Sequence, residues 1–365
     1  MVLERISILN YKNIEQVELV FSPKLNCFIG NNGMGKTNLL DAVYYLSFCK
    51  SHNNMVDTQN IRHNADFSLI QGYYLQEGKD EPDEFLCSIR RKQRKQFKRN
   101  KKEYERLSDH IGSLPLVFVS PSDSDLITGG SEERRKFMDV VLSQFDKEYL
   151  HSLIRYNKAL QQRNALLKSE ITDASLYELW EDQLVKEGQT IYGKRKTFVE
   201  EFIPTFQSYY DFICQSNEKV NLSYESQLSE DSLRGLLAQK RQKDKILGYT
   251  TVGVHRDDLD MRLDDYSMKK VGSQGQNKTY VIAMKLAQFD FLKRAGSTTP
   301  ILLLDDIFDK LDSSRVEQIV KLVSGENFGQ IFITDTNKDH LDEILKNINS
   351  NYCLYSVEKG GVSVL

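Results

Sequence analysis

The sequence has few of the features that mark membrane, secreted or disordered proteins. Its 365 residues include only 6 prolines and 20 glycines, and they contain no low-complexity stretch. No apolar run approaches the roughly 20 residues that a helix needs to cross a bilayer. The first residues also lack the basic, apolar and small-residue regions of a signal peptide. We therefore expect a cytoplasmic globular protein that has no membrane partner.

Cysteine is scarce too. The 5 cysteines, at positions 27, 49, 87, 214 and 353, are odd in number and have no Cys-x-x-Cys spacing. This pattern argues against a disulfide framework and structural zinc, and it favours a reducing compartment. The 6 histidines are spread thinly. We therefore expect His255, with Arg256 and Asp257, to serve structure or to couple a switch, and not to bind zinc.

Neither sign of charge dominates. The chain has 49 Lys and Arg against 52 Asp and Glu, a formal net charge of −3. A protein with this balance has no general attraction for nucleic acid, so any such binding must come from a local patch. With 40% hydrophobic residues, the chain is long enough for two lobes with substantial cores.

What the sequence does contain is a glycine-rich loop between a predicted buried strand (25–29) and a predicted helix (38–49). Glycines let backbone N–H groups converge on a phosphate, and the positive end of the helix dipole faces the same anion. Lys36 would reach the β- and γ-phosphates of ATP, and Thr37 would give its hydroxyl to Mg²⁺. The alternative is an ordinary glycine turn between a strand and a helix. The predicted ATP-binding residues of the loop are Gly30, Asn31, Asn32, Gly33, Met34, Gly35, Lys36 and Thr37.

A second motif combines an apolar strand with two acids. Residues 301–304 are all aliphatic, as in a strand buried on both faces. Two carboxylates follow at the end where open α/β sheets bind ligands. We expect Asp305 to bind the Mg²⁺, directly or through water, and Asp306 to polarise the attacking water as a general base. Alternatively, both acids only cap the next helix, which begins near Asp312.

Three segments of different texture follow one another along the chain. Residues 1–120 read mostly as strands, residues 121–297 are mostly helical, and residues 298–365 return to strands with helices between them. We therefore expect an α/β fold with a mixed sheet around the phosphate-loop helix. The two ends of the chain would form one ATPase lobe, and residues 121–297 would form a helical second lobe.

Finer features of these segments can also be predicted. In the helical segment we expect three or four helices up to residue 214, interrupted near Thr172 and at Gly188 and Pro204. In the last segment we expect a strand that ends at Thr334-Asp335, followed by a helix at 339–347. The pair Thr334-Asp335 would either contact the γ-phosphate and its water or cap that helix.

A third motif lies between the helical segment and the acidic strand. Ser273, Gly275 and Gln276 precede or open a predicted helix (276–294), and such a helix start can bind an anion. By itself the motif is more often a helix cap without a ligand. Its place after the glycine loop and before the acidic strand, however, resembles the order of motifs in ABC-type ATPases.

Within this class the chain resembles the RecF family over nearly its whole length. The stretches that carry the resemblance are Ile8–Asn13, Gly30–Asn38, Ser120–Gly130, Arg134–Asp139, Gln162–Lys168, Gly253–Leu259 and Leu303–Asp312. The sequence departs from the family pattern at Ser122, Ser131, Val254 and Lys310.

The resemblance implies an ATP-dependent homodimer in which Ser273, Gly275 and Gln276 of one copy contact the ATP of the other. It also implies that Lys12 and Asn13 contact ATP. The dimer would hold DNA (single-stranded, double-stranded or a junction), and a weak, DNA-stimulated ATPase activity would release it. Such a protein acts in recombinational repair, replication and the SOS response, with RecR and RecO, and helps to load RecA. The alternatives are an SMC-type chromosome-organising head and, less favoured, a transporter ATPase subunit.

The candidate DNA contact is a basic run. Residues 90–102 contain 9 basic side chains in 13 positions, and we expect a hairpin that turns near Arg99-Asn100. Such a patch would bind phosphates without reading sequence. Alternatively, its lysines protect a solvated sheet edge from aggregation. Arg134, Arg135 and Lys136 would add to the DNA surface; alternatively, Arg134 and Arg135 pair with local acids and hold the lobe together. The predicted DNA-binding residues are Arg91, Arg94, Lys95, Lys98, Arg99 and Lys101.

Overall fold

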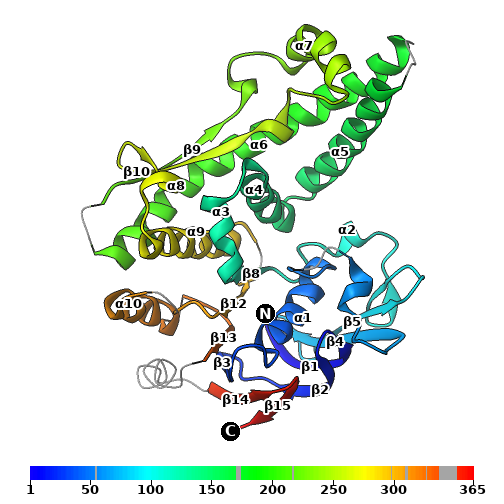
Figure 1. The fold of residues 1–365 in the computed structure, drawn as a ribbon. Coiled ribbons are helices and arrows are strands. Elements are labelled where there is room, and N and C mark those ends of the chain that lie inside the picture. Colours follow the sequence, from blue (N-terminus) through cyan, green and yellow to red (C-terminus); the bar gives the residue numbers. More distant parts are fainter. Residues whose placement is uncertain are drawn as a thin grey trace. The chain divides into compact units, whose positions relative to one another are not determined.

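The structure, a computed structural model, describes residues 1–53, 56–169, 174–215, 218–296, 298–308, 311–325, 327–336 and 352–365. Lys310, the predicted break near Thr172 and the predicted helix at 339–347 lie outside these residues. The chain forms two compact units, each described here by itself (Figure 1). One unit comprises Met1–Asp123, Phe212–Cys214 and Lys278–Leu365, and it is called the ATPase unit after the predicted lobe. The helical unit comprises Ser124–Asp211 and Gln215–Asn277.

The second boundary between the units differs from the predicted one at 297/298. It falls inside helix α9 (Gln274–Ala295), whose residues from Lys278 onwards belong to the ATPase unit. The side chains from Thr279 to Phe289 are buried, so this part of the helix is a core element of that unit.

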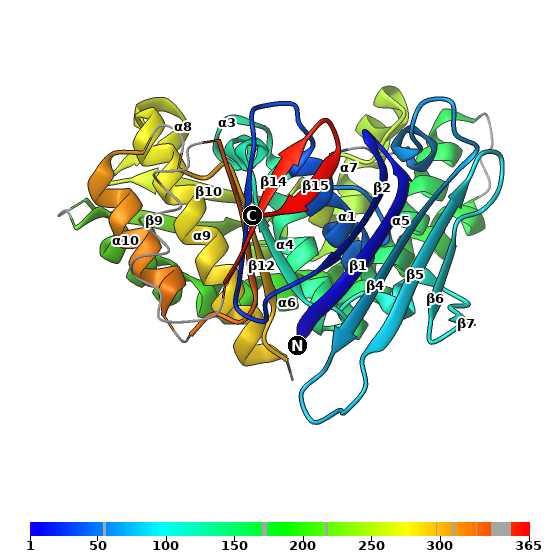
Figure 2. The ribbon, with the colours of Figure 1, turned by 90° about the horizontal axis from the view of Figure 1, so that it is seen from below.

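One sheet of the ATPase unit is antiparallel, with the strand order β2-β1-β4-β5-β6-β7 (Figure 2). Buried and less buried side chains alternate along β4 and β5, which is the pattern of strands with one covered face. The strands are β1 (Val2–Tyr11), β2 (Ile14–Val20), β4 (Phe67–Leu75), β5 (Asp83–Arg90), β6 (Gln96–Arg99) and β7 (Lys102–Glu103).

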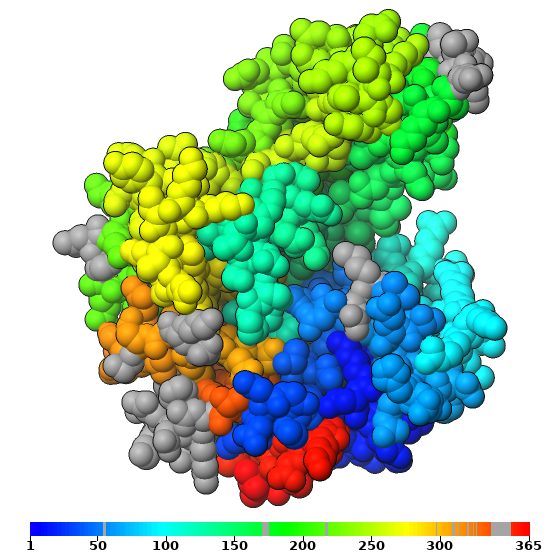
Figure 3. Space-filling model, in the orientation of Figure 1, coloured from blue at the N-terminus to red at the C-terminus, as the bar shows by residue number. Residues whose placement is uncertain are grey.

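The other sheet has the order β15-β14-β3-β13-β12-β8, and all its neighbours are parallel except β14 and β15. It unites strands from both ends of the chain, as predicted. Figure 3 shows the first residues (blue) and the last residues (red) side by side on the surface of this unit. The strands are β3 (Leu25–Ile29), β8 (Leu116–Val119), β12 (Ile301–Asp305), β13 (Ile331–Asp335), β14 (Tyr352–Glu358) and β15 (Gly361–Val364).

Helix α1 (Lys36–Phe48) contacts strands of both sheets, β1, β4 and β5 of the first and β8, β12 and β13 of the second. Its side chains from Leu39 to Phe48 are all buried, because a helix covered on both sides has no face for water. The predicted phosphate-loop helix is therefore confirmed as the centre of the unit. The remaining short elements are η1 (Asp57–Asn60), α2 (Leu107–His110), η2 (Pro121–Ser124) and α10 (Ser313–Ser324).

The helical unit is built on long helices and a small antiparallel sheet of order β11-β10-β9. Its helices include α3 (Asp125–Thr128), α4 (Ser131–Phe145), α5 (Lys147–Lys168), α6 (Ala174–Cys214), α7 (Leu233–Leu247) and α8 (Met268–Val271). Its strands are β9 (Val220–Glu225), β10 (Asp258–Leu263) and β11 (Tyr266–Ser267), and two short turns of helix are η3 (Gln227–Ser229) and η4 (Val254–Arg256).

The predicted interruptions at Gly188 and Pro204 are wrong, because α6 runs through both residues. A Cβ atom at Gly188 would lie 2.7 Å from Leu233 Cδ2 and 3.2 Å from Tyr156 Cε2, so this glycine permits close packing and does not end the helix. Pro204 lies between the buried Phe202 and Phe206. Burial of this aromatic face outweighs the hydrogen bond that a proline removes.

Helix α7 was missed by the sequence analysis although both its ends carry signals. The Ser232 hydroxyl accepts a hydrogen bond from the Gly235 N–H (3.2 Å), and Gly248 ends the helix at φ 73°. None of the described helices combines the length and the apolar composition that crossing a bilayer requires.

Candidate functional site: a phosphate loop beside two acids

The glycine loop connects the end of β3 to the start of α1. Gly33 and Gly35 have φ values of 79° and 113°, a left-handed backbone that glycine adopts at no steric cost. Residues 31–33 are exposed, so the cradle is open to a ligand. Within it the Lys36 ammonium donates to the backbone oxygens of Gly30 (2.7 Å) and Asn31 (3.2 Å). The loop thus has the shape and the charge of an anion site.

Thr37 and Asp305 lie together although 268 positions separate them in the chain. The Thr37 hydroxyl is 2.8 Å from Asp305 Oδ2, and the Thr334 hydroxyl donates to Asp305 Oδ1 at 2.7 Å. Burial raises the pKa of Asp305, while the two hydroxyl hydrogen bonds oppose that rise. A hydroxyl and a carboxylate at this spacing are hard oxygen donors, so these residues fit a Mg²⁺ ion.

Asp306 lies directly after β12 and has a left-handed backbone with φ 46°. Its N–H points at Thr334, 3.1 Å from the hydroxyl and 3.3 Å from the backbone oxygen. A non-glycine residue in this conformation costs energy and is held by its surroundings. The two acids do not cap the next helix, because the side chain of Asp312 does so by accepting from the Arg315 N–H at 2.9 Å.

Lys12 and Asn13, both predicted to contact ATP, contact different parts of the structure. Asn13 braces the loop, since its amide donates to the Met34 oxygen (3.2 Å) and accepts from Asn38 (2.8 Å). Lys12 instead forms an ion pair with the buried Asp41 at 2.5 Å. Both residues also line an open pocket of about 940 Å³ whose other wall comes from Gln59 and residues 61–67.

Ser273 directly precedes α9, and Gly275 and Gln276 lie in its first turn, in the helical unit. The Ser273 hydroxyl accepts from the Gln276 N–H (3.2 Å), and the Gln276 side chain accepts from the Ser273 N–H (2.9 Å). This reciprocal cap satisfies two of the donors at the helix start. Ser273 remains exposed, so its hydroxyl is accessible to a ligand.

The basic run 90–102 contains two turns. One is at residues 91–95, and the other is at Asn100-Lys101, between β6 and β7, one residue beyond the predicted turn near Arg99-Asn100. Part of its charge is used inside the fold. Lys95 donates to the Cys49 oxygen (2.5 Å) and pairs with Asp57, and Arg99 pairs with Asp83 at 2.8 Å.

The other predicted DNA-binding residues of this run are less committed to the fold. Arg91 is exposed and donates to the Ala65 oxygen at 3.1 Å. Arg94 and Lys101 are exposed, and Lys98 is half-buried. These four side chains are therefore within reach of phosphates, as are Arg90, Lys92 and Lys102, which are exposed as well.

Two arginines of α4 make local contacts, and Arg134 pairs with the side chain of an acid, which was the alternative interpretation of its charge. Arg134 forms a double hydrogen bond with Asp258 (2.5 and 2.9 Å), and Arg135 donates to the Asp257 oxygen at 2.7 Å. Lys136 lies 3.5 Å from the Glu133 carboxylate. The two arginines therefore tie α4 to the residues at the start of β10.

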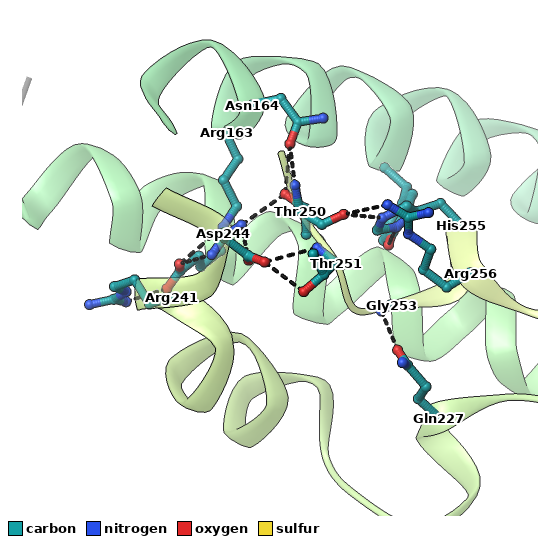
Figure 4. Close-up of polar contacts among 12 residues, drawn as sticks. Arg163, Asn164, Gln227, Arg241, Asp244, Thr250, Thr251, Gly253, His255 and Arg256 are labelled. Carbon is teal, nitrogen blue, oxygen red and sulfur yellow. Dashed lines mark hydrogen bonds and ion pairs between the residues drawn. The ribbon is translucent and has the colours of Figure 1, made fainter. Parts of the chain in front are cut away.

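His255 belongs to a polar network that fixes the loop before β10 (Figure 4). Its ring lies between the Tyr156 hydroxyl (2.8 Å) and the Thr250 oxygen (3.0 Å). Thr250 in turn accepts from Arg163, a fully buried side chain that also pairs with Asp244 at 2.8 Å. Burial lowers the pKa of His255 to about 4. The histidine is therefore neutral and structural within this unit.

Thr334 is the main site residue whose contacts the sequence analysis left open. Its hydroxyl donates to the Asp305 carboxylate and accepts from the Asp306 N–H, and the helix that it was alternatively predicted to cap lies outside the described residues. The one available signal was its place at the end of the strand next to β12, where side chains of neighbouring parallel strands meet.

Comparisons with known proteins place this geometry in context. Residues 2–362 match the family described as RecF/RecN/SMC N terminal domain. The DNA replication and repair protein RecF of Bacteroides thetaiotaomicron is 63% identical over 364 residues, which cover 100% of this chain and 98% of that protein. RecF of Phocaeicola vulgatus is 64% identical over 365 residues, with coverage of 100% and 98%.

Comparison with solved structures identifies the same family. One structure, described as the recombination mediator protein RecF-ATP in the RecFOR pathway, matches with a TM-score of 0.89 at 27% identity, covering 100% of this chain and 97% of that one. An Smc head domain from Pyrococcus furiosus matches with a TM-score of 0.59 at 15% identity, covering 100% of this chain and 96% of that one. The second likeness concerns the fold alone.

Proposed function

The chain belongs to the RecF family, and on that premise we propose that it is an ATP-dependent DNA-binding switch of recombinational repair and replication. The observation that carries the proposal is the hydrogen bond between Thr37 and Asp305 beside an open phosphate loop. It joins the two motifs that an ATP site needs, one from each end of the chain.

The proposed nucleotide site uses residues of the ATPase unit only. The backbone N–H groups of residues 30–37 cradle the phosphates, and Lys36 leaves its loop oxygens to neutralise the outer ones. Thr37 and Asp305 hold Mg²⁺, which when bound supplies positive charge to the phosphates. The pocket beside Lys12 and Asn13 receives the nucleoside end. Asp306 accepts a proton from the attacking water in slow hydrolysis.

We infer further that ATP joins two copies of the chain. Ser273, Gly275 and Gln276 of one copy would contact the terminal phosphate held by the other, since Ser273 is exposed at a helix N-terminus. The γ-phosphate then stabilises the dimer because it is shared by two chains. Hydrolysis removes that shared group and releases the pair.

The dimer would retain DNA through phosphate contacts, at single strands, duplexes or their junctions. The relative of known structure is described as a mediator in the RecFOR pathway. We extend that description to this chain as cytoplasmic work with RecR and RecO that assists RecA loading and the SOS response. An SMC-type chromosome-organising function is the second candidate, and it has the shared fold as its support.

Sedimentation velocity tests the proposal. Wild type should sediment as a monomer without nucleotide and as a dimer with ATP and Mg²⁺, and gapped DNA should co-sediment with the dimer. Ser273→Arg should bind ATP yet stay monomeric, because the arginine side chain blocks the partner's phosphate. Ser208→Arg, at an exposed serine of α6, is the matched control and should dimerise normally. A wild type that stays monomeric in saturating ATP and Mg²⁺ contradicts the proposal.

A further inference from the structure

The β14–β15 hairpin contacts the back of the phosphate loop. Figures 1 and 2 show this hairpin in red beside β2, close to the start of α1. At its turn, the Gly360 N–H donates to the Met34 oxygen at 2.8 Å, and the Lys359 N–H lies 3.4 Å from the Met34 sulfur. Met34 is one of the residues between the glycines of the loop, so the hairpin holds the loop itself.

A residue of a second turn donates a hydrogen bond to the same Met34 oxygen. The Asn13 amide, between β1 and β2, donates to Met34 O at 3.2 Å. The two turns also touch each other, since a Cβ atom at Gly360 would lie 2.4 Å from the Asn13 backbone oxygen. Gly360 has φ 84°, so a glycine is required there for both its conformation and its space. The β1–β2 turn at Asn13, the β14–β15 turn at Gly360 and the phosphate loop at Met34 are thus in mutual contact.

The direction of one peptide group gives this contact a function. In a planar trans peptide the C=O and the following N–H point in opposite directions. Two donors hold the Met34 C=O on the outer side of the loop, so the N–H of Gly35 points inward, toward the phosphates. Fixing this donor before ATP arrives lowers the cost of ordering the loop on binding.

We propose that the Lys359-Gly360 turn and Asn13 are positioning groups that orient the Gly35 N–H for nucleotide binding. Asn13 also lines the pocket proposed for the nucleoside, whereas Lys359 and Gly360 do not, so the glycine is the position at which this effect is tested by itself. The inference rests on the proposed ATP site and adds to it a control element from the last strands of the chain. Loop N–H groups cradle the α- and β-phosphates, so the effect should be equal for ATP and ADP.

Equilibrium titration of ATP and ADP against full-length variants tests the proposal. Gly360→Ala pushes the turn away from Asn13, so the Gly35 N–H loses its orientation. The affinity for ATP and for ADP should fall by about tenfold, as expected when one hydrogen bond to a charged phosphate is lost. Gly78→Ala is the matched control. It has nearly the same backbone angle, φ 80°, but nothing within 4 Å of the added Cβ. It should therefore carry the same strain and keep wild-type affinity.

Asn13→Ala provides an independent variant if Gly360→Ala does not fold. It should lower the affinity for ATP and the affinity for ADP by the same factor, about threefold. Melting temperatures of Gly360→Ala and Gly78→Ala separate a loss of stability from a loss of affinity. Wild-type affinity in a folded Gly360→Ala or Asn13→Ala overturns the inference and leaves the ATP site intact. A wild type that binds no nucleotide contradicts the proposed function instead.

Discussion

At the scale of single residues, the acidic motif depends on a buried carboxylate surrounded by hydroxyls. Asp305 accepts hydrogen bonds from Thr37 and Thr334, and Thr334 also receives the N–H of Asp306. Thr334 therefore links the residue proposed to hold Mg²⁺ to the residue proposed to activate water. The left-handed backbone of Asp306 is a strained conformation of the kind that concentrates at reacting groups.

Asp306→Asn should lengthen the lifetime of the ATP-dependent DNA complex. The amide keeps the shape of the side chain but cannot accept the proton of the attacking water, so we expect hydrolysis to fall by about a hundredfold or more. Dissociation from gapped DNA, followed after dilution into excess competitor, measures the lifetime. A complex that dissociates faster than wild type would refute the assignment of Asp306 as the base.

The buried His255 should make the helical unit sensitive to acid. Its pKa of about 4 in the folded chain lies below the ordinary value near 6.5, so protons bind the unfolded state more tightly. Its contribution to stability is complete above pH 6.5 and is lost as the pH falls toward 4, by about 3 kcal/mol at most.

His255→Gln isolates this effect, because glutamine cannot take up the proton. The single tryptophan, Trp180 in α6, reports unfolding of the helical unit by its fluorescence. The difference in stability between wild type and His255→Gln should shift in favour of the variant between pH 6.5 and 4. A difference that is constant over this range contradicts the assignment.

Residue positions could be predicted from sequence where a local pattern determines them. The open glycine loop and the contact between Thr37 and Asp305 agree with the sequence analysis, while the roles of these residues toward ATP and Mg²⁺ stay predictions. The ion pairs of Lys95 with Asp57 and of Arg99 with Asp83 were not, although the chain marks these residues as basic. A charge that faces a partner inside the fold and a charge that faces water look the same in a sequence.

At the scale of elements, α6 shows how packing overrides local signals. Gly188 and Pro204 are both helix breakers by propensity, at about 1 and 3 kcal/mol relative to alanine. Each nevertheless lies inside a continuous helix. Gly188 allows Leu233 and Tyr156 to approach the helix axis. These two side chains belong to α7 and α5, so the reason for the glycine is not visible in the sequence of α6. Sequence patterns within α6 therefore could not distinguish a contact glycine from a helix end.

Two glycine-to-alanine substitutions in α6 should change the free energy of unfolding in opposite directions. Gly188→Ala should lower the free energy of unfolding of the helical unit by about 1–2 kcal/mol, since the added Cβ collides with two buried side chains. Gly193→Ala has nothing within 4 Å of its Cβ and should raise it by about 0.5–1 kcal/mol through helix propensity. Urea unfolding followed by Trp180 fluorescence measures both. A stabilising Gly188→Ala would mean that the neighbouring side chains can move aside.

At the scale of the whole molecule, the ATPase unit gathers its parts from across the chain. β3, with the phosphate loop at its end, lies between β13 and β14. The fold class and this union of both ends were predicted from the order of motifs. The two units found here differ from the predicted lobes at α9, because contacts of this helix join positions far apart in the sequence. Lys285, for example, donates to the Phe118 oxygen of β8 at 2.9 Å.

DNA binding should depend on a local patch and not on total charge. Replacing Arg94, Lys98 and Lys101 together by alanine should weaken binding and reduce the slope of log K against log salt by about 2 to 3, near 0.9 for each lost phosphate contact. The control replaces Lys158, Lys186 and Lys196, which are exposed on helices of the other unit. An equal effect of both triple variants would show that net charge alone drives binding.

The position of β3 between two late strands has a consequence for protein synthesis. The phosphate loop leaves the ribosome early, but β13 and β14 are translated only in the last tenth or so of the chain, and pairings this distant form slowly. A nascent chain, or a product of a premature stop codon before Ile331, has the glycine loop without its neighbouring strands. We therefore expect that such a chain lacks the strand pairings that position the phosphate loop and does not hold ATP at the proposed site.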